Sequence, residues 1–190
     1  MPHIRFVTHA SAETGRYPSF PSSEDRLGSV GLGQCKRADL PRPLRLLRSP
    51  ARICEQTAAA LGWGDADVER DLRDQDPGLW AGRSIDTLSH EELTAWRSGV
   101  ALPGGEGVAA LIDRVRTLLD RFRSEPAGER LVALTHQSVA RAAFVVATSG
   151  TATDFWQVEL EPLSAFELRS DRIGWVIHLA GAGGTDRGRW

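Results

Sequence analysis

The sequence is short of cysteine, lysine and long apolar runs, and each shortage narrows what the chain can be. Its 190 residues include two cysteines, Cys35 and Cys54, which lack metal-ligand spacing and are too few for a disulfide framework. We expect both to be small buried apolar residues. No segment approaches the roughly 20 apolar residues of a membrane span. No signal peptide is predicted before the first apolar run, so we expect a cytoplasmic protein.

The sequence has nearly equal numbers of positive and negative residues. The formal net charge is −2, with 41% hydrophobic and 25% charged residues. Such a chain has no global field to attract nucleic acid or an anionic membrane. The length suits a single domain over residues 1–190, with a frayed tail at about 181–190. Lys36 is the only lysine, so nearly all cations are arginines, which bind phosphate bidentately wherever they line a pocket.

Apolar strands alternate with helices along the chain. Ser49 and Pro50 have the residue types of a helix N-cap and first turn. We expect strands at 3–8, 44–48, 67–70, 131–135, 156–161, 164–169 and 174–178, and helices at 31–40, 49–61, 85–97, 105–123 and 139–147. This alternation predicts an α/β fold, a three-layer α/β/α sandwich with a mainly parallel central sheet.

Two of the expected strands end in the same way, with Thr8-His9 and with Thr135-His136. Ligands of parallel sheets bind beyond the carboxyl ends of the strands. A lone histidine after a strand is more often structural, but two at neighbouring strand ends indicate chemistry. We therefore expect His9 and His136 to face each other in one pocket.

Six spaced motifs, the two histidine motifs among them, resemble the histidine phosphatase superfamily, the phosphoglycerate mutase-like group, over about residues 3–180. Their order and spacing agree with the family pattern throughout. The matching positions are Thr8-His9-Ala10 with Glu13-Thr14, Leu27-Gly28 with Gly31, Gln34 and Cys35, the run from Ser49-Pro50 to Gln56-Thr57-Ala58, Asp74 with Gly78, Trp80 and Gly82, Gly104-Gly105-Glu106 with Arg114, and Thr135-His136-Gln137-Ser138 with Arg141.

The resemblance implies hydrolysis of a phosphate monoester on a small, anionic metabolite. His9 would be the nucleophile that forms a phosphohistidine, and His136 would donate a hydrogen bond to the phosphate. Asp74 would be the general acid, although the family usually has the longer Glu there. No metal or cofactor is expected, and the strands near the carboxyl end could pair two copies as a homodimer. The candidate substrate contacts are Thr8, Arg16, Arg52, Glu106, Gln137 and Ser138.

Two positions depart from the family pattern, because Thr8 and Ile53 stand where the family has arginines that hold the phosphoryl oxygens. Losing two charge-assisted bonds costs about 3–6 kcal/mol, or about a hundredfold to ten-thousandfold in rate. Arg52 or Arg16 could replace them. Three interpretations follow: a phosphatase with rearranged cations, an enzyme that uses His9 and His136 as an acid–base pair on a less anionic substrate, or a non-catalytic binding protein.

Overall fold

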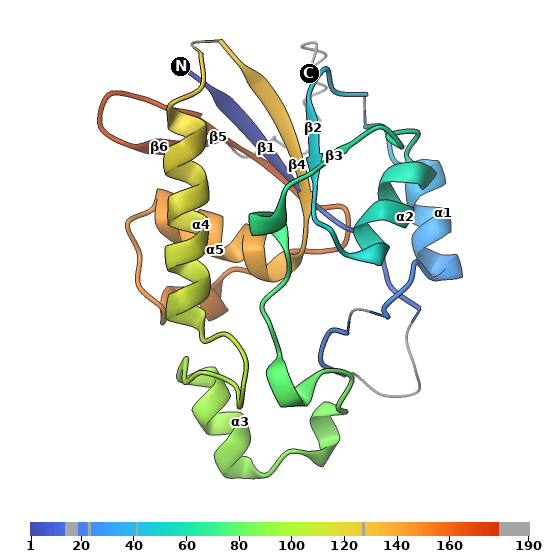
Figure 1. Cartoon of the computed structure of the whole chain (residues 1–190), viewed down its shortest axis with the longest axis vertical. Helices are drawn as coiled ribbons and strands as arrows, with labels where there is room; N and C mark the ends of the chain where they lie inside the picture. The colour runs from blue at the N-terminus through green and yellow to red at the C-terminus, as the bar shows by residue number, and fades with distance from the viewer. Residues whose placement is uncertain (14–18, 23, 41, 127, 179–190) are drawn as a thin grey trace.

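The computed structural model describes residues 1–13, 19–22, 24–40, 42–126 and 128–178. Figure 1 shows the order of its elements along the chain. The strands are β1 (His3–Thr8), β2 (Leu46–Arg48), β3 (Asp67–Val68), β4 (Arg130–Thr135), β5 (Ala165–Ser170) and β6 (Trp175–His178). The α-helices are α1 (Ser29–Arg37), α2 (Arg52–Ala60), α3 (His90–Arg97), α4 (Val108–Arg123) and α5 (Gln137–Ala147). Short 3-10 helices are η1 (Arg70–Leu72), η2 (Gly78–Trp80), η3 (Ile85–Thr87) and η4 (Asp154–Gln157).

The six strands form one sheet in the order β3-β2-β4-β1-β5-β6. Neighbours among β3, β2, β4 and β1 are parallel, whereas β5 runs antiparallel to both β1 and β6. The predicted mainly parallel sheet is therefore confirmed. β6 lies at one edge of the sheet, and homodimer formation through this edge stays a prediction.

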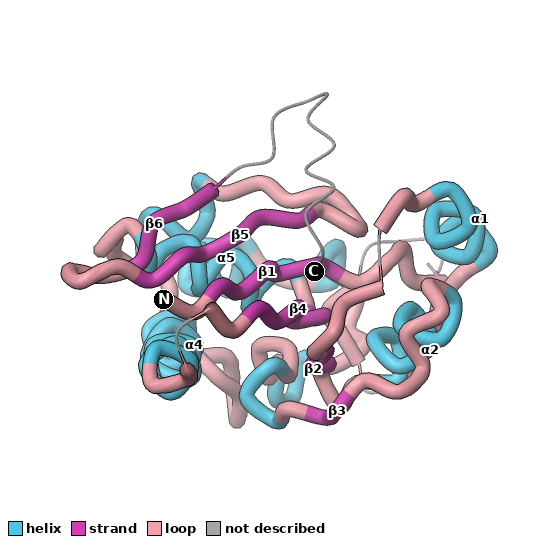
Figure 2. The backbone as a smooth tube through the Cα atoms, turned by 90° about the horizontal axis from the view of Figure 1, so that it is seen from above, coloured by secondary structure: helices cyan, strands magenta, loops and turns pink. Residues whose placement is uncertain are grey.

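Side chains of the central strands alternate between two cores, as expected for buried strands. On one face, Ile4 and Phe6 of β1 pack with α4 and α5. On the other face, Val7 of β1 packs with Ile53 and Cys54 of α2, and α1 lies beside α2. Figure 2 shows the strands between these two groups of helices. Full burial of one such side chain contributes about 1.5–3 kcal/mol, so the two cores fix the three-layer arrangement.

Several expected elements differ from the structure in extent or type. Helix α2 begins at Arg52, with Ala51 at the N-cap, because Ser49 accepts a hydrogen bond from Ala51 N (3.2 Å) outside the helix. The expected helix at 85–97 is divided into η3 and α3, because Ser89 and Glu92 form a capping box that starts a new helix. The expected strand at 156–161 is wrong, since η4 and an irregular segment occupy this part of the chain.

The expected helix at 105–123 begins later, at Val108. The cause is the close approach of Gly105 to the segment before η2. A Cβ atom at Gly105 would lie 2.4 Å from the carbonyl oxygen of Asp76, so only glycine fits. This contact ties the start of α4 to residues 74–78, the segment that carries Asp74.

A third apolar cluster lies outside the two faces of the sheet, around Phe20, Trp80 and Trp96. Figure 1 shows α3, which carries Trp96, at the end of the molecule opposite the N-terminus. Cys35 and Cys54 are buried and free, as predicted. None of the described helices is long and apolar enough to cross a membrane.

Candidate active site

Three neighbouring parallel strands end at the same edge of the sheet and set the positions of His9, His136 and Ser49. Thr8 and Thr135 are paired in register, so the two histidines follow paired residues. The His9 amide donates to the Thr135 carbonyl (2.8 Å), and the Ser49 amide donates to the Leu134 carbonyl (2.9 Å). The imidazole rings lie edge to face, with centroids 5.1 Å apart. The structure thus brings the two predicted histidines together.

One ring nitrogen of His9 has a fixed role. Nδ1 lies 2.8 Å from the carbonyl oxygen of Ala10. A carbonyl oxygen can accept a hydrogen bond but cannot donate one, so Nδ1 carries the proton. Burial, and next the positive charge of His136, lower the pKa of His9, while the Ala10 contact and Asp74 partly oppose them. His9 is therefore a neutral imidazole whose Nε2 lone pair is available to attack an electrophile.

His136 is held from both ring nitrogens and has the opposite charge preference. Nδ1 lies 3.3 Å from Asp74 Oδ2, and Nε2 lies within hydrogen-bonding distance of Ser49 Oγ (2.8 Å). The Cys54 thiol also lies 3.6 Å from Nε2. Burial alone would lower the pKa of His136, but the Asp74 carboxylate, with a smaller contribution from Cys54, raises it well above its usual value. His136 is therefore an imidazolium at neutral pH.

Asp74 is the counterion of His136. Its Oδ1 accepts hydrogen bonds from the Ser138 hydroxyl and from the Gln75 amide (2.8 Å). Burial alone would raise the pKa of Asp74, but His136 and Ser138 outweigh this effect and lower the pKa well below its usual value. A carboxyl group that is ionised at neutral pH has no proton of its own to give. The proton expected on the general acid Asp74 thus resides on His136.

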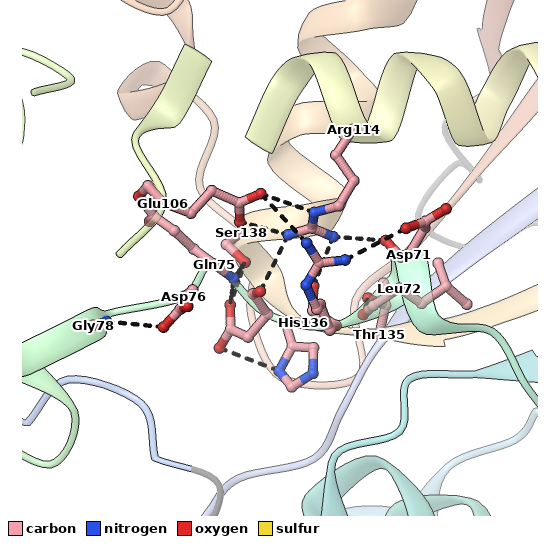
Figure 3. A network of polar contacts seen from close by, with 12 residues as sticks. Asp71, Leu72, Gln75, Asp76, Gly78, Glu106, Arg114, Thr135, His136 and Ser138 are labelled. Carbon is pink, nitrogen blue, oxygen red and sulfur yellow. Dashed lines mark hydrogen bonds and ion pairs between the residues drawn. The ribbon is translucent and has the colours of Figure 1, made fainter. Parts of the chain in front are cut away.

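Arg114 of α4 fixes the segment that carries Asp74. Its guanidinium donates to the carbonyl oxygens of Asp71 (2.7 Å), Arg73 (3.0 Å) and Asp74 (3.1 Å), and it forms an ion pair with Glu106 (2.7 Å). Figure 3 shows Arg114 between Glu106 and Asp71, on the side of this segment away from the His136 ring. Asp74 is therefore positioned by a largely buried cation that does not line the cavity over the histidines.

That cavity has a volume of about 1050 Å³ and opens over the two imidazole rings. His9, His136 and Asp74 lie in its wall, together with the predicted contacts Arg52, Gln137 and Ser138. A second part of the wall is aromatic and comes from Phe20, Trp96, Phe155 and Trp156. The cavity therefore joins a polar region at the strand ends to an apolar region.

Two other predicted substrate contacts, Thr8 and Glu106, do not line the cavity. Thr8 is buried, and its hydroxyl donates to the carbonyl oxygen of Glu161 (2.8 Å) rather than toward a ligand. The Glu106 carboxylate accepts hydrogen bonds from Arg114 and is therefore occupied away from the cavity. These two expectations are corrected by the geometry, because each side chain already has a partner elsewhere. Arg16 lies outside the described residues.

Sequence reasoning missed the roles of two residues that define the site. The pattern predicts Ser49 as a helix N-cap, whereas its hydroxyl also lies 2.8 Å from His136 Nε2. Its place directly after a parallel strand, as for both histidines, is the signal that could have revealed it. The three carbonyl contacts of Arg114 had no local signal, since 40 to 43 positions of sequence separate the partners.

Comparison with known proteins identifies the family. The sequence model of the histidine phosphatase superfamily (branch 1) matches residues 36–182, more than half of the chain. The chain therefore belongs to the histidine phosphatase superfamily. Curated relatives include the probable phosphoglycerate mutase GpmB of Salmonella newport (strain SL254), which is 29% identical over 119 residues. That match spans 59% of this chain and 51% of the relative, so the chain spans about half the length of the curated relatives it matches.

Solved structures share the fold. Mycobacterial glucosyl-3-phosphoglycerate phosphatase has a TM-score of 0.78 and 21% identity, with coverage of 93% of this chain and 97% of that one. The α-ribazole phosphatase from Shigella flexneri has a TM-score of 0.79 and 16% identity, with coverage of 93% and 95%. The predicted phosphoglycerate mutase-like architecture is thereby confirmed. At these identities the likeness shows the fold, and the activity of this chain depends on its own site.

Proposed function

We propose that this chain is a phosphatase that hydrolyses a small phosphorylated metabolite through a phosphohistidine at His9. The observation that carries this proposal is the pair of facing imidazoles at neighbouring strand ends, with His9 Nδ1 on the Ala10 carbonyl and His136 Nδ1 on Asp74. His9 is neutral with its proton on Nδ1, whereas His136 is cationic beside Asp74. A neutral nucleophile next to a fixed cation suits attack on an anionic phosphate ester.

In the first step, Nε2 of His9 attacks the phosphorus atom, an N–P bond forms, and the bond from phosphorus to the ester oxygen breaks. The departing oxygen takes the proton that His136 Nδ1 holds against Asp74, so the alcohol leaves neutral and His136 becomes neutral. In the second step, water attacks the phosphohistidine, and the His136–Asp74 pair takes a proton from it. Inorganic phosphate leaves, and His9 and His136 return to their starting states.

Arg52 supplies a cation for the phosphoryl oxygens in place of the arginines missing at Thr8 and Ile53. It lies next to Ile53 on α2 and lines the cavity with His9. Its guanidinium makes no hydrogen bond or ion pair with any residue that the structure describes, so it is available to an anion. One charge-assisted bond from Arg52 would recover about 1.5–3 kcal/mol of the loss.

A second candidate is an enzyme that uses His9 as base and His136 as acid on a less anionic substrate. The observation that favours it is the wall above His9, where Thr8 is turned away and Ile53 is apolar. The same pair of protonation states would serve both reactions. Only the phosphatase forms a bond between phosphorus and His9, so a covalent intermediate separates the two candidates.

Trapping that intermediate tests the proposal. The protein is mixed with aryl phosphates, quenched in alkali to preserve phosphohistidine, and analysed by ³¹P NMR and by mass spectrometry of the peptide that contains residue 9. We expect phosphate on His9 in the wild type and none in His9→Ala. His178→Ala, at the edge strand and away from the cavity, is the matched control. If esters are hydrolysed with no phosphate on His9, or if none is hydrolysed at all, the proposal fails.

A further inference from the structure

Two of the arginines that line the cavity have no ion-pair partner among the described residues, and the chemical step uses only one of them. Of the four lining carboxylates, Glu55 pairs with Arg48 and Asp74 pairs with His136, whereas Asp25 and Asp76 accept from the backbone amides of Ser22 and Gly78. Of the three lining arginines, Arg73 pairs with Asp71. Arg52 and Arg141 form no ion pair within the described part of the chain. Two free cations in one cavity favour a ligand with two anionic groups.

Arg141 lies at the aromatic part of the wall. It is on α5, three and four positions after Ser138 and Gln137, so these three residues share one face of the helix, and all three line the cavity. Arg141 lies about one helical turn, or about 5.4 Å along the helix axis, farther from the strand ends than Gln137 and Ser138. The guanidinium carbon lies 5.9 Å from the ring centre of Phe155. Arg141 is thus displaced from the proposed phosphate position toward the apolar region.

The aromatic wall is continuous. Phe20 contacts Trp96 (5.0 Å between ring centroids), Trp96 contacts Trp156 (4.9 Å), and Trp156 contacts Phe155 (5.0 Å), all edge to face. Such a wall favours an apolar or aromatic body on the ligand. Arg141 Nε and the indole nitrogens of Trp96 and Trp156 are buried donors with no acceptor among the described residues. These atoms are closed to solvent, so they lie behind the cavity wall, and a ligand in the cavity would meet the terminal nitrogens of the Arg141 guanidinium instead.

We propose that Arg141 binds a carboxylate of the substrate, so that the preferred substrate is a phosphate monoester whose alcohol combines an apolar, preferably aromatic, body with a carboxylate. The phosphate lies between His9, His136 and Arg52, the body packs on Trp96 and Trp156, and the carboxylate reaches Arg141. The planar guanidinium suits a carboxylate because it can donate two parallel hydrogen bonds. This assignment rests on the proposed phosphatase function.

The test compares two aryl phosphates that differ only in charge, carboxyphenyl phosphate and its carboxamide analogue, carbamoylphenyl phosphate. We expect the wild type to favour the carboxylate by about 10- to 100-fold in kcat/KM, the range of one charge-assisted contact. Arg141→Met should bring this ratio close to one. Arg141→Lys, which keeps the charge but not the fork, should give an intermediate ratio and shows that the helix tolerates substitution. Arg116→Met, which breaks an exposed ion pair with Asp113 on α4, should leave the ratio unchanged.

A wild-type ratio near one, or a ratio that Arg141→Met does not change, overturns the carboxylate assignment while the phosphatase function stands. If neither ester is hydrolysed, the phosphatase proposal fails by itself, and calorimetry decides the subsite with the same two compounds and variants. Tighter binding of the carboxylate that depends on Arg141 then supports the subsite. Equal binding of the two compounds, or no binding of either, overturns it.

Discussion

The two ends of the cavity differ in how their polar groups are partnered. At the strand ends, His9, His136 and Asp74 each have fixed hydrogen-bond or ion-pair partners from several elements. At the aromatic end, Arg141 has no ion-pair partner among the described residues, and Trp96 and Trp156 line the wall. The first end has its polar groups in place before any ligand arrives, which suits a catalytic centre. The second end keeps a cation available to a ligand, which suits a recognition site. Substitutions at the first end should therefore affect all substrates alike.

Removal of His136 should have the largest effect. His136→Ala takes away the proton donor, and general acid catalysis contributes about 10²- to 10⁴-fold in rate. We expect a loss in this range for alkyl phosphates and a clearly smaller loss for 4-nitrophenyl phosphate, whose leaving group needs no proton. Steady-state kinetics with both esters checks this expectation. Equal losses for the two esters would show that His136 does not donate the proton.

Removal of Arg114 should also disrupt the strand-end part of the cavity, because Arg114 holds the segment that carries Asp74. Arg114→Met leaves the largely buried Glu106 with only the more distant Arg73 (3.9 Å), and loss of a buried partner costs up to about 3–5 kcal/mol of unfolding free energy. The carbonyl groups at 71–74 are also released, so Asp74 loses its position and activity falls with every substrate. Urea denaturation gives the stability change. The double variant Arg114→Met with Glu106→Gln removes the uncompensated charge, and it should recover part of the stability but not the activity. Recovery of both would show that Arg114 does not position Asp74.

Asp74→Asn tests the origin of the charge on His136. The carboxylate raises the pKa of His136, so kcat/KM at high pH should decline only as this histidine loses its proton. In the Asp74→Asn variant the pKa of His136 should fall to its ordinary value of about 6.5 or below, because burial then lowers it with only Cys54 in opposition, and the alkaline limb of the pH profile should move down with it. We expect a loss of about 10- to 100-fold at neutral pH. An alkaline limb that stays in place would exclude Asp74 as the cause.

The Asp74–His136 ion pair should also make the free energy of unfolding depend on pH. Asp74 has a lowered pKa, so its contribution is present above its unfolded value of about 3.9 and is lost as pH falls toward the folded value. His136 has a raised pKa, so its contribution is complete below about 6.5 and is lost as pH rises through the folded value. The difference in unfolding free energy between wild type and Asp74→Asn should therefore be largest between about pH 3.9 and about pH 6.5. A difference independent of pH would contradict the ion pair.

Ile53→Arg adds a cation at the strand-end part of the cavity in place of removing a group, and we expect it to have the smallest effect. Ile53 lines the cavity next to Arg52, so a guanidinium there can reach the proposed phosphate position. One added charge-assisted bond is expected to tighten binding of vanadate or inorganic phosphate by about tenfold or more. Isothermal titration calorimetry measures this change, and thermal unfolding reports the cost to the core that Ile53 shares with Cys54 and Trp63. Weaker phosphate binding in a folded variant would place the phosphate elsewhere.

The sequence predicted the parts of this molecule that depend on local pattern. The continuous apolar runs at 3–8 and 131–135 predicted the central strands, and strand-end geometry then predicted that His9 and His136 meet. The contacts of Arg114 and the true role of Ser49 depend on which distant segments come together, which periodicity does not encode. Thr8 was expected to face a ligand because its hydroxyl is a donor, but the Glu161 carbonyl from the far end of the chain already accepts it.

The most direct test of this account is the protonation of the two imidazoles in the resting protein. With ¹⁵N-labelled histidine, NMR at neutral pH reports the state of each ring nitrogen, and His9→Ala and His136→Ala assign the signals. We predict that His9 is neutral with its proton on Nδ1 and that His136 carries protons on both nitrogens. Two neutral rings, or a charged His9 beside a neutral His136, would contradict the account.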